Sequence, residues 1–343
     1  MKICIVGLGA IGGLFAGWLA SRLPPGEVVV SALARGETLA AVRRRGLLLH
    51  GPAGALSLQL RVASDAAELG PQDLVVLAVK APSLAAVAPA VQSLLAPHTR
   101  VLTAMNGVPW WFFSGLAGPC EGLSLQSIDP GGVVAAAIPA EQVIGCVVHV
   151  SSLAPAPGEV RHISGTGLVI GHPAGRHVGA MDDRLEATSA LLRRTGFTVT
   201  LSESIQREVW FKLWGNMTMN PISALTNATC DRILDDPLVR GFCSAVMLEA
   251  QAIGAAFGIP IEQRPEDRHA VTRKLGAFKT SMLQDLQASK PLELDALLGA
   301  VREIGGRLGL ATPNIDALFG LARLLARQRG LYPAAPEDAG LRS

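Results

Sequence analysis

The sequence predicts an α/β N-terminal domain with a parallel sheet, followed by an all-α C-terminal domain. Short apolar runs such as Lys2–Val6 and Asp73–Lys80 alternate with helix-like segments, as in a parallel sheet that helices cover on both faces. Toward the C-terminal end of the chain only helical periodicity continues. We therefore expect one domain at 1–203, a second at 204–335 and a tail at 336–343.

The composition fits a soluble, two-domain protein. The 343 residues are 49% hydrophobic and 17% charged, with a net charge of +2. Scattered arginines and a single tyrosine argue against a nucleic-acid partner, and glycines interrupt the apolar N-terminus, so we expect neither a signal peptide nor a membrane span. Five cysteines lack metal-ligand spacing. Cys4 and Cys146 lie in strand-like runs, which predicts reduced thiols, no metal and a cytoplasmic protein.

A glycine-rich turn directly follows the first strand. The segment 7–12 reads GLGAIG and leads into an apolar helix, which is the context that the dinucleotide fingerprint requires. Gly7 permits the tight turn, Gly9 lets the backbone approach a pyrophosphate, and Gly12 lets helix and strand pack closely. The helix N-terminus offers N–H groups to phosphates. The first domain is therefore predicted to be a Rossmann-type nucleotide-binding domain.

The end of the second strand, Glu27–Leu33, indicates which dinucleotide binds. An NAD enzyme would carry Asp or Glu here to accept a hydrogen bond from the ribose 2′-hydroxyl. This chain instead has Arg35, a cation suited to a 2′-phosphate, although an ordinary surface arginine is the alternative. We predict NADP, in its reduced form NADPH, as the cofactor.

Two further polar residues follow predicted strands. Lys80 ends the strand Asp73–Lys80, and Asn106 follows the strand Arg100–Met105. Ligands bind at the carboxyl ends of strands in open parallel sheets, so both are site candidates, although either could simply form a turn. The segment Val143–Ile170 predicts further strands and a hairpin, and the strand order across 110–175 stays open.

The second half contains long helices. Leu234–Phe257 and Pro291–Leu308 show apolar helical periodicity, the latter with proline in its first turn. Glu293 borders the apolar stripe of the last of these helices, whereas Asp295 points the other way on the helical wheel. A first-turn acid favoured by the helix dipole is the simpler interpretation of Glu293, and a site residue is the other.

One helix, within Glu208–Ala224, carries an unusual polar row. Lys212, Asn216 and Asn220 lie one turn apart, among the apolar side chains of the same stripe. Burying these groups without partners would be costly, so the row is expected to line a cleft. A lysine there can be tuned toward proton donation, although one that snorkels to solvent is the alternative.

These segments together resemble the ketopantoate reductases (2-dehydropantoate 2-reductases). The resemblance rests on the GLGAIG turn, Arg35, VKA at 79–81, NG at 106–107, KLWGNMTMNPISAL at 212–225, and SMLQD at 281–285 with the subsequent Glu293. The chain differs from many relatives at Phe278 and Cys230, which leaves the exact 2-keto acid open.

The resemblance implies two domains that enclose a cleft, NADPH along the first of them, and reduction of ketopantoate to pantoate for pantothenate synthesis. It implies that Lys212 is the general acid and that the substrate contacts are Asn216, Asn220, Ser281, Glu293 and Asn106. The implied cofactor contacts are Gly7, Leu8, Gly9, Ala10, Ile11, Gly12, Arg35, Lys80 and Asn106.

The chemistry of the residues agrees with this reaction class. Hydride delivery to a ketone builds negative charge on oxygen, which a lysine on a dry wall can neutralise with a proton. The expected partner is a small 2-keto acid, and a homodimer stays open. One alternative is an NADP-dependent reductase of another 2-keto or hydroxy acid. The other is a non-catalytic NADP-sensing Rossmann protein, which would have no use for a proton donor.

Overall fold

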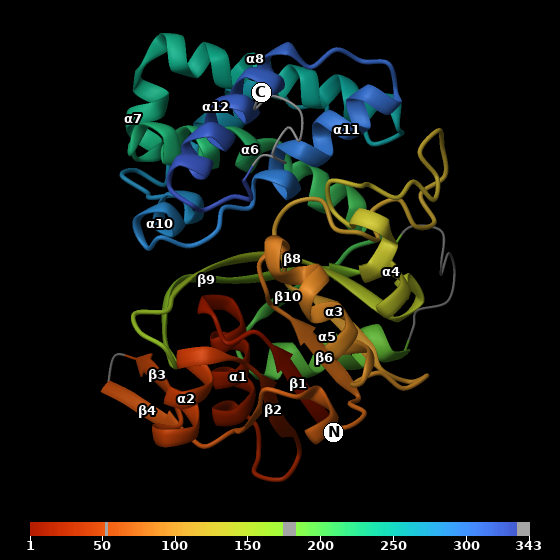
Figure 1. The fold of residues 1–343 in the computed structure, drawn as a ribbon, viewed down its shortest axis with the longest axis vertical. Helices are drawn as coiled ribbons and strands as arrows, with labels where there is room; N and C mark the ends of the chain where they lie inside the picture. The colour runs from red at the N-terminus through yellow and green to blue at the C-terminus, as the bar shows by residue number, and fades with distance from the viewer. Residues whose placement is uncertain (52–53, 174–182, 335–343) are drawn as a thin grey trace, which may run out of the picture. The chain divides into compact units, whose positions relative to one another are not determined.

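The structure, a computed structural model, describes residues 1–51, 54–173 and 183–334, so the expected tail at 336–343 lies outside the described residues. The chain divides into two compact units, unit 1 at Met1–Val209 and unit 2 at Trp210–Ser343 (Figure 1). Unit 1 is α/β and unit 2 is helical, which confirms the predicted fold class. The domain limits expected at 203 and 335 stay predictions.

Six parallel strands form the centre of the sheet in unit 1. In spatial order they are β5 (Arg61–Ala63), β2 (Val29–Leu33), β1 (Lys2–Val6), β6 (Leu74–Leu77), β7 (Arg100–Thr103) and β8 (Val143–Leu153). All five pairings are parallel. This arrangement is the 3-2-1-4-5-6 order of a dinucleotide-binding fold, in which the direction of winding reverses beside β1.

A long antiparallel strand extends the sheet. β9 (Glu159–Gly171) forms the predicted hairpin with β8, and its other edge is shared by two parallel partners, β3 (Leu47–Gly51) and β10 (Thr198–Leu201). β4 (Gly54–Leu58) completes the edge as a hairpin with β3 (Figure 1). The order across 110–175, which the sequence left open, is thereby fixed by β9.

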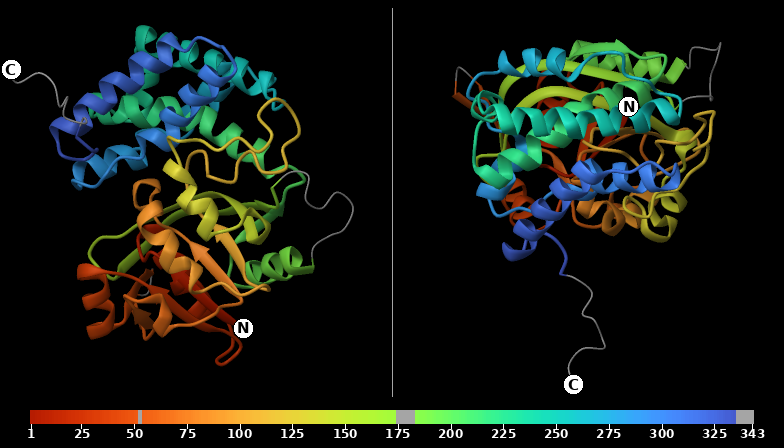
Figure 2. Two further views of the ribbon diagram at one scale, coloured as in Figure 1. Left: turned by 45° about the vertical axis from the view of Figure 1, so that its right-hand side comes forward. Right: turned by 90° about the horizontal axis from the view of Figure 1, so that it is seen from above.

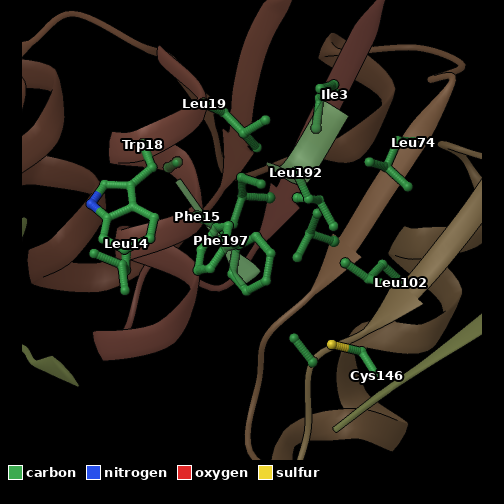
Figure 3. Close-up of a cluster of buried hydrophobic side chains, with 14 of the residues drawn as sticks. Ile3, Leu14, Phe15, Trp18, Leu19, Leu74, Leu102, Cys146, Leu192 and Phe197 are labelled. Carbon is green, nitrogen blue, oxygen red and sulfur yellow. The ribbon is translucent and has the colours of Figure 1, made fainter. Parts of the chain in front are cut away.

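Helices cover the sheet, and the hydrophobic core lies between these helices and the sheet. They are α1 (Ala10–Arg22), α2 (Gly36–Arg45), α3 (Leu84–Gln92), α4 (Val133–Ala137) and α5 (Asp183–Arg194), with short 3-10 turns at Ala66–Glu68, Ala81–Ser83, Pro130–Gly132 and Ala140–Gln142. In α1 the rings of Phe15 and Trp18 lie 4.7 and 4.5 Å from that of Phe197 (Figure 3). Each such buried ring stabilises the fold by about 1.5–3 kcal/mol.

Unit 2 is a set of packed helices. They are α6 (Ile205–Thr226, which begins in unit 1), α7 (Cys230–Asp235), α8 (Pro237–Ala256), α9 (Pro265–Arg273), α10 (Ser281–Gln287), a π-helical turn η5 (Asp295–Gly299), α11 (Ala300–Arg307) and α12 (Pro313–Gln328). α8 packs against α7, α9, α11 and α12, and it lies beside α12 in Figures 1 and 2. Among the described helices, α8 alone is long and apolar enough to cross a membrane, and 33% of its apolar window is buried.

The helix predicted at Leu234–Phe257 is interrupted. α7 ends before Asp236, and α8 begins at Pro237. The Asp236 carboxylate accepts hydrogen bonds from the N–H groups of Leu238 and Val239 at 2.9 and 3.0 Å, as a helix N-cap does. The Asp-Pro pair is a start signal that the apolar periodicity concealed.

The helix predicted at Pro291–Leu308 begins later than expected, and its first turn is a wider, π-helical one. Helical structure starts at Leu294, and the Glu293 carbonyl oxygen accepts from the Leu297 N–H, so Glu293 lies at the very start of the helix and the choice between a helix-end acid and a site residue stays open. Asp295, which the α-helical wheel directed away from the core, is half-buried and accepts a hydrogen bond from the Tyr332 hydroxyl at 2.7 Å. The wheel failed because the first turn is π-helical.

Candidate active site

The glycine-rich turn of unit 1 has the geometry of an anion cradle. Gly7 has φ +92°, a conformation that side chains disfavour, and a Cβ atom on Gly12 would lie 1.9 Å from the Gly7 carbonyl oxygen. The turn and packing roles predicted for these two glycines are thus confirmed. A Cβ on Gly9, by contrast, would meet nothing within 4 Å. Open space therefore lies beside the backbone where a pyrophosphate is expected.

The N-terminus of α1 leaves its N–H groups available. Gly9 is the N-cap, so no side chain caps the helix, and no acidic residue lies in its first turn. Such an end carries partial positive charge and favours phosphate. The residues at 7–12 therefore fit the pyrophosphate of a dinucleotide.

The other candidate residues of unit 1 follow strands that all end at the same edge of the sheet. Val6 at the end of β1 is in register with Leu33 of β2 and with Leu77 of β6, and Leu77 is in register with Thr103 of β7. The turns after these four strands therefore begin side by side. Arg35 lies two residues beyond the end of β2. Lys80 and Asn106 lie three residues beyond the ends of β6 and β7, respectively.

Each of these three residues begins a turn or a helix. Exposed Arg35 is the N-cap of α2, and half-buried Lys80 is the N-cap of the 3-10 turn Ala81–Ser83. Asn106 is half-buried and precedes Gly107, which has φ +81°. The structure thus places the cofactor candidates of unit 1 along one edge of the sheet.

The polar row of unit 2 lies on α6. Lys212 and Asn216 are half-buried, and Asn220 is 6% exposed. The apolar neighbours predicted for the row, including Leu213 and Met217, are buried, so the row stands inside an apolar surface as expected. Neither asparagine side chain makes a hydrogen bond to another residue in the described parts of the chain. No atom of either amide in the described structure is both enclosed and without a partner, so both amides remain open to a polar ligand.

Ser281 and Glu293 lie on separate elements of unit 2. Ser281 is the exposed first residue of α10, whose N-cap Thr280 accepts a hydrogen bond from the Leu283 N–H at 3.2 Å. Glu293 is 9% exposed, and its carbonyl oxygen accepts from the Leu297 N–H at 3.3 Å. These hydrogen bonds fix the backbone from which the Ser281 and Glu293 side chains project.

The two positions that depart from the family pattern are neighbours. The Cys230 N–H donates to the Phe278 carbonyl oxygen at 3.0 Å, and the Phe278 side chain is 36% exposed. A substitution at Phe278 or at Cys230 can therefore affect the backbone at the other position.

The sequence interpretation missed Arg268. Its guanidinium lies 5.4 Å from the Phe211 ring, and a Cβ atom on Gly215 would come within 2.5 Å of its Nε atom. Nε is enclosed without a hydrogen-bond partner in the described structure, and burial lowers the pKa of this arginine. The signal was Gly215 itself, a residue that is costly inside a helix and directly precedes Asn216.

The described part of the chain contains no cluster of side chains suited to a metal ion. No group of three or more His, Cys, Asp or Glu side chains there could hold a metal ion. The five cysteines are buried and free, and burial raises the pKa of Cys4 to about 12. Burial also raises the pKa of Cys120, Cys230 and Cys243, so these thiols are not activated as nucleophiles.

Comparison with known proteins identifies the family. Residues 3–110 match the family model described as "Ketopantoate reductase PanE/ApbA", and residues 204–326 match that of its C-terminal part. A 2-dehydropantoate 2-reductase from Mesorhizobium japonicum is 42% identical over 97% of this chain and all of its own length. One from Halobacterium salinarum is 29% identical over 95% of this chain and 99% of its own length.

Solved structures agree with the family models. A protein from Ralstonia solanacearum assigned to the ketopantoate reductases is 54% identical, has a TM-score of 0.90, and covers 96% of this chain and 99% of its own. D-mandelate dehydrogenase with bound NADH shares the fold, with a TM-score of 0.78 at 20% identity over 96% of this chain and all of its own. The chain therefore belongs to the ketopantoate reductase family.

Proposed function

We propose that this protein reduces 2-dehydropantoate (ketopantoate) to pantoate with NADPH. The observation that carries the proposal is the row on α6. In it a lysine stands within an apolar surface, beside two asparagines whose side chains lack partners in the described structure. Relatives of nearly full length are named 2-dehydropantoate 2-reductase, which supports the same substrate.

Unit 1 would hold the cofactor. The cradle at 7–12 and the uncapped N-terminus of α1 suit the pyrophosphate, and Arg35 suits the 2′-phosphate. Lys80 and Asn106 leave the same sheet edge and would contact the ribose and nicotinamide. When bound, NADPH supplies the hydride that reduces the ketone.

Unit 2 would supply the proton and bind the substrate. Lys212 donates a proton to the ketone oxygen as negative charge develops there, and its half-buried setting limits competition from water. Asn216 and Asn220 donate amide hydrogen bonds that fix the substrate, and Ser281 offers a hydroxyl to its carboxylate. Glu293 accepts a hydrogen bond from the substrate hydroxyl, which explains a carboxylate near an anionic ligand.

A panel of 2-keto acids offered with NADPH tests the proposal by the loss of reduced-nicotinamide absorbance. We expect ketopantoate to give the highest kcat/KM, followed by the same skeleton without its hydroxyl. In Glu293→Ala the advantage of ketopantoate should shrink about tenfold or more, because the hydroxyl loses a charged acceptor. A different preferred acid would replace the substrate assignment. Tight NADPH binding with no turnover on any acid would favour a sensor.

We also propose a cytoplasmic homodimer. The outer face of α8 is uncharged, with Leu238 and Leu248 84% and 54% exposed and with small residues at Gly241 and Ala245 beside them. In an antiparallel pair of such helices, each leucine would pack over a small residue of the second copy. Light scattering should give a dimer mass for the unmodified protein and a monomer mass for Leu248→Glu. Leu321→Glu on α12, with a similar exposure of 58%, is the control, and a monomer without any substitution would refute the proposal.

A further inference from the structure

The chain beyond α12 folds back onto the segment that carries Glu293. The Leu292 N–H donates to the Leu331 carbonyl oxygen at 3.1 Å, and the Tyr332 hydroxyl donates to the Asp295 carboxylate at 2.7 Å. These two hydrogen bonds, here named the C-terminal clasp, hold the backbone of Leu292 before Glu293 and the side chain of Asp295 after it. Residues near position 331 therefore help to fix the position of the Glu293 backbone.

The clasp is itself firmly anchored. Leu331 is 7% exposed, and its N–H donates to the Ala326 carbonyl oxygen at 2.8 Å. Nε of Arg327 donates to the Pro333 carbonyl oxygen at 3.0 Å, and the Arg327 guanidinium lies 5.6 Å from the centre of the Tyr332 ring. Tyr332, the single tyrosine of the chain, is thus held between contacts to α12 on both sides.

The residues after Glu293 form an unusually wide helical turn. The Glu293 carbonyl oxygen accepts from Leu297 with α-helical spacing, whereas the Asp295 carbonyl oxygen accepts from Ala300, one residue further on. One extra residue in a turn rotates the residues before the turn by about 100° relative to the rest of the helix. The π-helical turn therefore sets the direction of Glu293 relative to α11.

The Asp295 carboxylate sits where it can hold this turn open. A Cβ atom on Gly299 would lie 2.9 Å from Oδ1, so glycine at this position leaves room for the carboxylate beside the turn. Burial raises the pKa of Asp295, and the hydrogen bond from Tyr332 partly offsets that effect. Removing the hydroxyl would leave a half-buried carboxylate without this donor, at a cost in free energy.

We propose that Tyr332 is a positioning residue, which through Asp295 keeps the π-helical turn in place and so directs Glu293 toward the substrate hydroxyl. This inference rests on the proposed function, because it concerns how that hydroxyl is recognised. Without the clasp the turn is free to relax to α-helical spacing, and Glu293 then faces another direction. Tyr332 contributes to substrate selectivity without touching the substrate.

The experiment compares Tyr332→Phe, Asp295→Asn and a control, Thr272→Val. For each, kcat/KM is measured with ketopantoate and with the analogue that lacks the hydroxyl. In Tyr332→Phe the preference for ketopantoate should fall about tenfold, through a raised KM for ketopantoate and with an unchanged KM for NADPH. Asp295→Asn should retain most of the preference, because its amide oxygen still accepts from Tyr332. Thr272→Val removes a different half-buried hydroxyl bond, to the Arg268 carbonyl oxygen, and should leave the preference unaltered.

Hydrogen exchange at the Leu297 and Ala300 amides provides a readout that needs no substrate. Faster exchange in Tyr332→Phe together with the lost preference supports the inference. Unchanged exchange overturns it, and so does faster exchange with the preference intact, since the clasp would then be only structural. If the unmodified enzyme shows no preference for ketopantoate, the proposed function fails, and exchange alone decides whether Tyr332 holds the turn.

Discussion

Lys212 is the residue on which the proposed chemistry depends most directly. It is half-buried on α6, one turn from Asn216. Because a general acid acts only as the alkoxide forms, Lys212→Ala should lower kcat about a hundred- to ten-thousandfold while NADPH affinity is retained. Steady-state kinetics and a direct NADPH titration check this. A normal kcat with a raised KM would instead make Lys212 a substrate clamp.

Arg35 determines the expected choice of cofactor. It is exposed at the N-terminus of α2, where a charge-assisted contact with a 2′-phosphate contributes about 1.5–3 kcal/mol. NADPH should therefore be used about ten- to a hundredfold better than NADH, and Arg35→Ala should reduce that gap with little effect on NADH. The ratio of kcat/KM for the two cofactors measures this. Equal efficiency in the unmodified enzyme would refute the role of Arg35.

At the scale of elements, the β1–α1 turn separates packing from binding. Gly12 and Gly9 lie in the same turn, yet a Cβ atom would collide with the Gly7 carbonyl oxygen at the first position and meet nothing at the second. Gly12→Ala should therefore lower the melting temperature strongly, whereas Gly9→Ala should leave it nearly unchanged and weaken NADPH binding. Thermal unfolding and NADPH titration of both variants test this pair. Equal melting losses would mean that Gly9 is also a packing residue.

The sequence predicted those elements whose geometry is local. The GLGAIG turn, the strands β1 and β2 and the row on α6 can be inferred from spacing within a few residues, and each is present. The wide turn at Asp295–Gly299 was not predictable in this way, because it depends on Tyr332, 37 residues further along the chain. A helical wheel at 100° per residue assumes α-helical spacing and so misplaced Asp295.

The strand order past β7 was unpredictable for a related reason. β9 pairs with β8, β3 and β10, which lie both before and after it in the sequence. No local pattern states which of these partners an apolar strand will choose, and register is decided when faces are buried together. Candidate site residues were easier to choose, because most of them follow predicted strands or lie at helical spacing, and their roles stay predictions.

At the scale of the whole molecule, acid stability should depend on His269. This histidine in α9 is 4% exposed, and neither ring nitrogen has a partner among the described residues. Burial lowers its pKa, and nearby Arg240 and Arg273 act in the same direction, whereas Glu266 opposes them. Below the unfolded value of about 6.5, the unfolded chain binds a proton that the folded chain does not, so stability falls as pH falls.

A comparison of unmodified protein with His269→Leu tests this dependence. The free energy of unfolding, measured by urea titration between about pH 7 and pH 5, should decline less steeply in the variant because one proton-linked group is gone. The slope is compared and not the absolute stability, since the substitution also alters packing. Parallel slopes would show that other groups control the acid response.

The shared edge of β9 has a consequence for synthesis of the chain. β3 and β10 both pair with this edge, at Glu159–Arg161 and Gly167–Ile170 respectively. β3 leaves the ribosome about 115 residues before the middle of β9, whereas β10 ends at Leu201. A nascent chain therefore carries an unfinished sheet with an open edge until residue 201 has emerged, and such edges are where chains aggregate. Ribosome pausing after Leu201 would let the sheet close, whereas pausing shortly before Thr198 would prolong the exposure.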